Sequence, residues 1–470
     1  MPVDPKNRLN DLDSRQWLQF QKSWFQVSEN TIEEFFRFFT KQKRADGQIS
    51  RIGILPEHFD RLATAVRACE RQPSMIDDSI ENGAVDYVLV DWRDEKDTIE
   101  SYNGKGSARL AKIHAAARAL RRDAYFTFFM RNAGNNATLL PLAWHFSRQV
   151  AGIVSPKDEK IACEPPAQLG KVSGWQTEQN FFYCLTFRKE HDVPEIVPSF
   201  QPLQISHPTD HSPEKTTHRR PAWNVVKPPP REKGVLLHPA KFPEPMIAQF
   251  IEDFSEPGEL VLDPMAGTGS ALLAARRTGR RCAGIELNPT FVEIIRQRLQ
   301  QDDMFNTGVM NALICGDATS EVPYRALPPM IDYVVTSPPY WDMLRMKGAE
   351  TQQKRRDAGL PVFYSDQAQD LGNLSDYEDF LNMLIKAYRL VVDRLKPGGF
   401  MTVIVKNVKK KGKVYPLAWD IAFALAPFME LRHEQIWCQD DQKLAPFGYR
   451  YAWVSNTFHH YCLHFRKPSR

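Results

Sequence analysis

The residues with the clearest chemical potential form the short run Ser337-Pro338-Pro339-Tyr340, which is followed by Trp341. The run comes directly after the apolar segment 331–335, and it must end a strand because proline has no N–H for the sheet ladder. The turn would present a hydroxyl, a backbone carbonyl free of sheet pairing and two aromatic faces. These groups suit a flat nucleobase held by its exocyclic amine. The simpler interpretation is a Pro-Pro turn that ends a core strand.

A glycine-rich loop upstream favours the first interpretation. The segment 261–270 runs from an apolar strand through Asp263 and Met265 to Gly267 and Gly269, and then into a helix. Glycines at this place let a ligand approach the backbone and the N-terminus of the helix closely. The third glycine of the dinucleotide-binding fingerprint is missing, and no Gly-Lys-Ser/Thr follows as it does in a phosphate-binding P-loop. The loop therefore predicts a site for a different small ligand.

Two acidic residues follow later strands of the same segment. Glu286 comes after strand 281–285, where a carboxylate can accept hydrogen bonds from both hydroxyls of a ribose. Asp317 comes after strand 312–315, where an adenine amine would lie. Ligands of open α/β folds bind at the carboxyl ends of strands. We therefore expect the loop, the two carboxylates and the Ser-Pro-Pro-Tyr turn to form one site.

The elements that must position these residues alternate along residues 235–470. The pattern predicts helices at 244–253, 271–278, 290–300 and 377–395, and strands at 260–262, 281–285, 312–315, 333–336 and 400–405. Alternating strands and helices are typical of a parallel sheet covered on both faces. The fold class predicted for this segment is therefore α/β, with a Rossmann-like sheet.

The composition sets wide limits. The chain has 470 residues, 42% of them hydrophobic, and a net charge of +4, which allows two or three domains but does not by itself indicate nucleic acid. The seven cysteines form no CxxC pair, which argues against a zinc site, and we predict no metal. The start lacks an apolar signal segment and no apolar run is long enough to cross a bilayer. We expect a cytoplasmic protein with no membrane contact.

Residues 81–190 are predicted to be a degenerate copy of the catalytic half. Three blocks recur in the same order: Asp86–Leu89 as Asp332–Val335, Pro141–Trp144 as Pro416–Trp419, and Tyr183–Lys189 as Tyr461–Lys467. The first copy has Val90-Asp91-Trp92 in place of the Ser-Pro-Pro-Tyr-Trp turn, and no glycine-rich loop precedes it. We therefore expect the first copy to be non-catalytic.

The remaining segments complete the predicted domain organisation. Residues 1–80 carry aromatic residues at roughly helical spacing, which predicts a helical N-terminal region. Residues 191–234 are rich in proline and read as a linker, and residues 235–470 as the catalytic domain. One hypothesis is that residues 1–190 act as a built-in second subunit that clamps DNA or reads sequence.

Over residues 235–470 the chain resembles the amino-group DNA methyltransferases, which methylate cytosine N4 or adenine N6 with S-adenosylmethionine. The resemblance implies a catalytic tetrapeptide at Ser337, Pro338, Pro339 and Tyr340. It implies a cofactor pocket built from the following residues: Lys241, Phe242, Asp263, Met265, Gly267, Gly269, Glu286, Asp317 and Thr336. Met265 departs mildly from the family, since many members carry Phe at this place.

The mechanism that the resemblance implies is direct methyl transfer to a flipped base. The base would stack against Tyr340 and Trp341, while Ser337 and the carbonyl of Pro338 accept hydrogen bonds from its amine. Ser at the first catalytic position favours cytosine N4, with adenine N6 as the alternative. An RNA base N-methyltransferase on the same fold, and a catalytically idle DNA-binding or assembly protein, are the competing hypotheses.

Double-stranded DNA is the predicted partner, and the resemblance also allows for a cognate restriction endonuclease or a defence-system partner. Basic residues at two places are candidate DNA contacts. They lie in the insertion 342–376 and just after strand 400–405, and they are Arg345, Lys347, Lys354, Arg355, Arg356, Lys409, Lys410 and Lys411. The simpler interpretation of each charged run is a solvated face.

Overall fold

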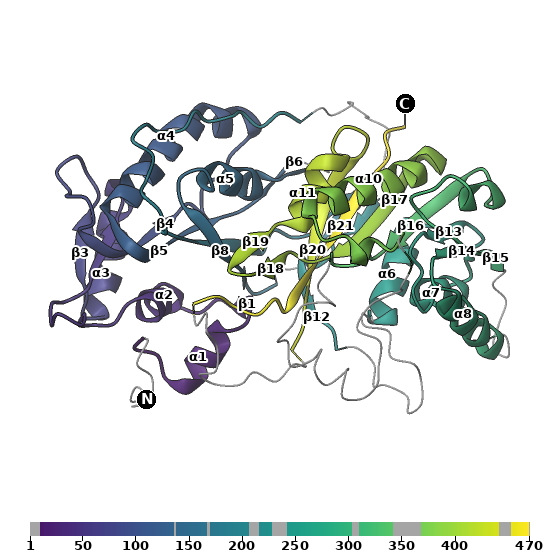
Figure 1. The fold of residues 1–470 in the computed structure, drawn as a ribbon, viewed down its shortest axis with the longest axis horizontal. Coiled ribbons are helices and arrows are strands. Elements are labelled where there is room, and N and C mark those ends of the chain that lie inside the picture. The colour runs from purple at the N-terminus through teal and green to yellow at the C-terminus, as the bar shows by residue number, and fades with distance from the viewer. Residues whose placement is uncertain are drawn as a thin grey trace.

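The computed structural model describes residues 10–135, 138–166, 170–205, 216–227, 242–302, 310–341, 367, 369–440 and 453–469. These residues form two large sheets that lie side by side, one in the purple and blue half of Figure 1 and one in the teal to yellow half. Within the described residues, no helix combines the length and apolar character needed to cross a membrane.

The second sheet has eight strands and carries the predicted catalytic turn. Their order in the sheet is β12 (Trp223–Val225), β20 (Glu430–Cys438), β21 (His459–Arg466), β17 (Leu395–Val405), β16 (Ile331–Thr336), β13 (Leu260–Asp263), β14 (Arg281–Glu286) and β15 (Met310–Cys315). The strands from β17 to β15 are parallel, whereas β21 runs antiparallel to β17 and to β20. The expected parallel sheet is therefore present, with one antiparallel strand that the sequence pattern did not predict.

Helices cover both faces of this sheet, as its strand sequences require. Leu260 and Leu262 of β13 pack in one core cluster, while Val261 packs in another, because successive side chains of a strand point to opposite faces. The helices are α6 (Glu244–Phe254), α7 (Ser270–Arg277), α8 (Pro289–Asp302), α10 (Tyr377–Arg394) and α11 (Leu417–Leu425). The helices and strands predicted for residues 244–405 are confirmed.

The first sheet repeats this architecture. Its seven strands are ordered β1 (Trp24–Gln26), β8 (Ser155–Cys163), β10 (Phe181–Arg188), β5 (Leu120–Met130), β4 (Val85–Asp91), β2 (Arg51–Ile54) and β3 (Gln72–Met75). Each strand matches one strand of the second sheet in position, and the pairing is again antiparallel at β10 and parallel at β1. Its helices are α1 (Ser14–Phe20), α2 (Thr31–Phe39), α3 (Phe59–Ala68), α4 (Ile99–Ala119) and α5 (Leu142–Val150). The duplication therefore includes the sheet itself.

Two predicted boundaries change as a result. Residues 10–80 contain the expected helices, but they also supply β1, β2 and β3 to the first sheet, so this region is not helical alone. The aromatic residues that suggested helices pack on both α2 and the strands, as in the ring contact between Phe35 and Phe129 at 5.0 Å. Within the predicted linker, β12 is an edge strand beside β20, and Leu203 is buried.

Equivalent residues of the two copies meet at a buried interface. Trp144 and Trp419 stack with ring centroids 6.0 Å apart. The amide of Asn132 donates to Glu434 at 3.0 Å, and the equivalent Asn407 donates to Glu159 at 2.9 Å. Each copy thus supplies the same asparagine and the same glutamate to the other, as two subunits do across the twofold axis of a dimer. Here the two partners are halves of one chain.

Candidate active site

The carboxyl ends of β13, β14, β15 and β16 open into one cavity. Gly267 of the glycine loop and Ser337 of the catalytic turn both line it, as the shared-site expectation requires. The predicted residues that line it are Phe242, Asp263, Met265, Gly267, Glu286, Asp317, Thr336, Ser337, Pro338 and Pro339. The sheet brings them together because its parallel strands place consecutive loops at the same edge.

Three of the described residues that were predicted for the cofactor and base site, Gly269, Tyr340 and Trp341, do not line this cavity. Gly269 has a φ of 82° and caps the start of α7, where an added Cβ would lie 3.0 Å from Ile295, so both its backbone conformation and its packing favour glycine. Tyr340 and Trp341 lie just beyond the lining residues, and both are buried. Lys241 lies outside the described residues.

Glu286 ties the second strand of the site to the glycine loop. Its carboxylate accepts hydrogen bonds from the backbone N–H groups of Gly267 at 2.7 Å and Asn288 at 2.8 Å. Burial raises the pKa of Glu286 to about 7, although the two N–H donors oppose the shift and the charge of Asp263 adds to it. A carboxylate has about four acceptor positions, so Glu286 keeps capacity for a hydroxyl donor.

Asp263 lies at the end of β13, on the neighbouring strand. It accepts a hydrogen bond from the N–H of Met265 at 3.1 Å, and burial raises its pKa to about 7 as well. The two carboxyls therefore face one cavity in an environment that disfavours their negative charge. A cationic ligand would relieve this penalty for both.

Two further carboxylates complete an acidic lining. Asp317 is held by its own turn, since it accepts hydrogen bonds from the N–H and the hydroxyl of Thr319 at 2.8 and 2.9 Å. Asp370, which the sequence analysis did not identify, also lines the cavity and accepts a hydrogen bond from the N–H of Gly372 at 2.8 Å. It was not singled out from the sequence because it lies within the insertion 342–376, which was expected to face DNA.

The rings of Tyr340 and Trp341 sit in a cluster of aromatic and basic side chains. The ammonium of Lys406 lies 5.2 Å from the ring centroid of Tyr340, and the ring of His460 packs 5.8 Å from it. Burial lowers the pKa of Lys406 to about 8. On the other side, Lys410 lies 3.9 Å above the ring of Trp341. The two aromatic side chains after the Pro-Pro pair are thus each covered by a cation.

The predicted DNA contacts are only partly described. Arg345, Lys347, Lys354, Arg355 and Arg356 lie outside the described residues. Lys409 forms an ion pair with Asp158 and is mostly buried, which does not fit the predicted contact with a phosphate. Lys410 faces Trp341, and Lys411 is exposed at a turn.

The first copy lacks the catalytic turn and the glycine loop at the equivalent place, although a cavity lined by Trp92, Arg93 and Asn132 lies beside the end of β4. In the matching sheet register, Asp91 stands where the second copy has Ser337. Asp91 is buried and forms an ion pair with Arg61 of α3 at 2.9 Å. The strand β2 continues into the short 3-10 helix Pro56–His58, where the second copy has its glycine loop. These features agree with the expectation that the first copy is non-catalytic.

Comparison with known proteins supports the predicted resemblance. Residues 87–297 match the N6_N4_Mtase family, described as DNA methylase. The match runs from β4 of the first copy through the glycine loop into α8, and it stops before the Ser-Pro-Pro-Tyr turn, so its extent differs from the predicted 235–470.

Two curated relatives are Type II methyltransferases. The chain is 38% identical to M.Cfr9I of Citrobacter freundii over 86 residues, which cover 18% of this chain and 27% of that protein. It is 33% identical to M2.DpnII of Streptococcus pneumoniae over 75 residues, covering 16% of this chain and 28% of that one. The chain therefore spans about a quarter of the length of the curated relatives that it matches.

Two solved structures that resemble this chain are described as methyltransferases. The 16S rRNA N2 G1207 methyltransferase of T. Thermophilus, solved with AdoMet and guanosine, is 16% identical with a TM-score of 0.26, covering 91% of this chain and 90% of that one. The methyltransferase from Pyrococcus furiosus is also 16% identical, with a TM-score of 0.28, and covers 50% of this chain and 88% of that one. The Rossmann-like α/β fold follows from the sheet order described above.

Proposed function

From this relationship to the DNA methylases, we propose that the chain transfers a methyl group from S-adenosylmethionine to the exocyclic amine of a flipped base in double-stranded DNA, with cytosine N4 as the target. The observation that carries the proposal is the single cavity that Gly267 and Ser337 both line. A cofactor site and an amine-binding turn are useful for group transfer only when they share one space.

The lining of the cavity fits S-adenosylmethionine, which carries positive charge on its sulfonium and amino groups. Asp263, Glu286, Asp317 and Asp370 give the cavity an acidic wall, and Phe242 adds an apolar one. Glu286 is suited to accept the ribose hydroxyls, and Asp317 to accept the adenine amine. When bound, the cofactor supplies a methyl group on a sulfonium sulfur, which leaves as a neutral thioether.

The Ser-Pro-Pro-Tyr turn is suited to orient the amine. The hydroxyl of Ser337 and the carbonyl of Pro338 accept hydrogen bonds from the N–H groups and so turn the lone pair of the nitrogen toward the methyl group. Tyr340 is suited to stack on the flipped base, while Trp341, whose ring contacts Lys410, Tyr377 and Tyr415, supports the turn beside it. Catalysis then depends on position rather than on a covalent intermediate.

The choice of cytosine N4 rests on Ser337, because a hydroxyl rather than a carboxylate or carboxamide stands at the first position of the turn. Adenine N6 and RNA bases are the alternatives. Sequencing of DNA from a host that expresses the chain should map N4-methylcytosine at one recurring sequence. N6-methyladenine at the site would overturn the choice of base. Transfer of tritiated methyl to tRNA but not to duplex DNA would overturn the choice of substrate.

The affinity for S-adenosylmethionine should rise with pH up to about 7 and then level off. Asp263 and Glu286 have pKa values raised to about 7 by burial, so below that pH the free protein holds them neutral. A cationic ligand favours their ionised forms, so binding releases one proton for each carboxyl that becomes ionised, and the Kd should increase about tenfold per pH unit below 7 for each proton released. Calorimetry between pH 5.5 and 8.5, in buffers of different ionisation enthalpy, measures both quantities. A pH-independent Kd without proton release would contradict the acidic wall as the cation site.

A further inference from the structure

The segment 406–415, here called the active-site hairpin, connects the first copy to the catalytic turn. It leaves the end of β17 and forms the two short strands β18 (Val408–Lys410) and β19 (Lys413–Tyr415). Lys411 and Gly412 both have positive φ, 50° and 74°, as the tight turn between paired strands requires. Its residues divide into two sets that face opposite partners.

One set faces the catalytic turn. Lys406 lies over Tyr340, Lys410 lies over Trp341, and the ring of Tyr415 packs 4.8 Å from the ring of Trp341. Trp341 itself has a φ of 51°, which is unfavourable for a residue with a bulky side chain. Such a conformation persists only where surrounding groups hold it.

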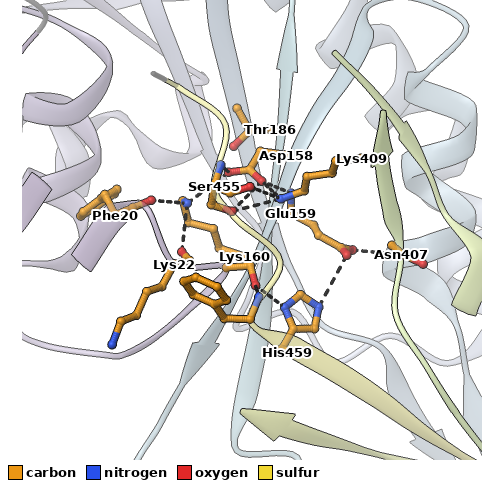
Figure 2. Close-up of polar contacts among 12 residues, drawn as sticks. Phe20, Lys22, Asp158, Glu159, Lys160, Thr186, Asn407, Lys409, Ser455 and His459 are labelled. Atoms are coloured by element: carbon orange, nitrogen blue, oxygen red, sulfur yellow. Dashed lines mark hydrogen bonds and ion pairs between the residues drawn. The ribbon is translucent and has the colours of Figure 1, made fainter. Parts of the chain in front are cut away.

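The other set is held by β8 of the first copy. Glu159 accepts a hydrogen bond from Asn407, Asp158 forms an ion pair with Lys409, and Lys157 donates to the carbonyl of Gly412 at 2.8 Å. Three consecutive residues of the first copy therefore each contact a different residue of the active-site hairpin. Figure 2 shows Asp158 and Glu159 directed at Lys409 and Asn407.

Asp158 is the centre of this contact. It accepts hydrogen bonds from the hydroxyl and the N–H of Ser455 at 2.8 and 3.0 Å, and Lys160 lies 3.1 Å away, as seen in Figure 2. Burial acts to raise the pKa of Asp158, but the ammonium groups of Lys160 and Lys409 outweigh it and hold the pKa at about 2. Asp158 is therefore ionised at neutral pH, and the grip on Lys409 is a buried charged contact.

The ion pair between Asp158 and Lys409 is not repeated at the equivalent positions on the other side of the interface. In the register that relates Asn132 to Asn407 and Glu159 to Glu434, the counterparts of Asp158 and Lys409 are His433 and Gly134. An added Cβ at Gly134 would lie 3.8 Å from His433, so the two positions are neighbours there too, but they carry no ion pair. The contacts of Trp144 with Trp419 and of the two Asn–Glu pairs follow the twofold relation between the copies. The contact between Asp158 and the active-site hairpin does not.

A second line of contacts from the first copy reaches the same tryptophan. Arg148 of α5 forms an ion pair with Asp420 of α11, and Asp420 accepts a hydrogen bond from the hydroxyl of Tyr377. The ring of Tyr377 packs 5.4 Å from that of Trp341 and 5.0 Å from that of Tyr415. Trp341 is thus enclosed by groups that the first copy holds in place.

We propose that the first copy is a built-in positioning subunit, and that Asp158 acts through Lys409 and the active-site hairpin to hold Tyr340 and Trp341 in the geometry that receives the target base. This inference rests on the proposed function and gives the non-catalytic copy a role in it. Asp158 and Lys409 are positioning residues, since neither lines the cavity.

The test compares Asp158→Asn and Lys409→Gln in the full chain. The two variants change the charge near the site in opposite directions but release the same contact. Each should lower kcat for methyl transfer to DNA about tenfold, because small displacements of a positioned group are costly. The Kd for S-adenosylmethionine should not change, and the double variant should be no slower than the slower single one. Lys409→Gln keeps the pair between Asp158 and Lys160, so it tests the contact even if Asp158→Asn does not fold.

Glu434→Gln is the matched control. It is an acid-to-amide change at the same interface, but its partners Asn132 and Tyr183 belong to the first copy. It should leave kcat at the value of the unaltered protein. If Asp158→Asn strengthens DNA binding, Lys409→Gln weakens it and kcat is unchanged in both, Lys409 acts by its charge and the positioning role is wrong. Equal losses of kcat in all three variants would also overturn it.

Hydrogen exchange separates this inference from the proposed function. Amides of residues 408–415 should exchange faster in Asp158→Asn and Lys409→Gln than in Glu434→Gln, whether or not the chain methylates DNA. If the exchange rates were unchanged, the inference that Asp158 holds the active-site hairpin through Lys409 would be wrong. Failure of the unaltered protein to transfer methyl groups to any DNA would instead overturn the proposed function.

Discussion

Ser337→Ala should lower the rate of methyl transfer by roughly 10²- to 10³-fold, the range found when one preorganised hydrogen-bonding group of an active site is removed. The hydroxyl lines the cavity just beyond the end of β16, between the cofactor loop and the aromatic pair, and in the proposed mechanism it orients the amine. The change removes one oxygen at a half-buried position, so the fold should persist.

Single-turnover rates at saturating S-adenosylmethionine measure this effect directly, and calorimetry should find the affinity for the cofactor unchanged. Ser320→Ala is a suitable control, because Ser320 belongs to the neighbouring turn after Asp317 and does not line the cavity. A variant at Ser337 that kept the full rate would show that the turn does not orient the amine.

Glu286→Gln should weaken the binding of S-adenosylmethionine about 100-fold, because charged hydrogen bonds in a buried site contribute more than neutral ones. The carboxylate has a second task, since it accepts the N–H groups of both Gly267 and Asn288. An amide can accept only through its oxygen, so one of these donors loses its partner and the glycine loop loosens.

Two measurements separate these effects. Calorimetry gives the Kd for the cofactor. Thermal denaturation without the cofactor gives the loss of protein stability, and denaturation with the cofactor shows how much of that stability ligand binding restores. The control is Glu293→Gln on α8, whose side chain is largely exposed. A Glu286→Gln protein that is less stable but binds the cofactor normally would show that Glu286 only supports the loop.

The candidate site was largely predictable because its signals are local. Asp263, Glu286, Asp317 and Ser337 each follow an apolar run, and parallel strands bring such positions to one edge whatever the rest of the chain does. The strand and helix order of residues 244–405 followed from the same alternation. The duplication was visible for the same reason, since repeated blocks of sequence need no three-dimensional information.

The extent of the first copy was not predictable in this way. Strands β1, β2 and β3 have three or four residues each. Such short strands do not show the alternation of buried and exposed residues that identifies a strand, and the aromatic residues around them have helical spacing. Only their pairing within the sheet identifies them. The assignment of residues 1–80 as helical therefore failed where tertiary pairing overrode the local pattern.

By itself, the sequence determined which candidate site residues gather at one edge of the sheet. Only the tertiary structure decided that Asp370 joins the cavity and that Lys409 faces Asp158 rather than a phosphate. The end of a strand can be predicted from the residues that directly precede and follow it in the sequence. A contact between β8 and the active-site hairpin joins residues more than half the chain apart, and it arises only when two packed cores fix their distance.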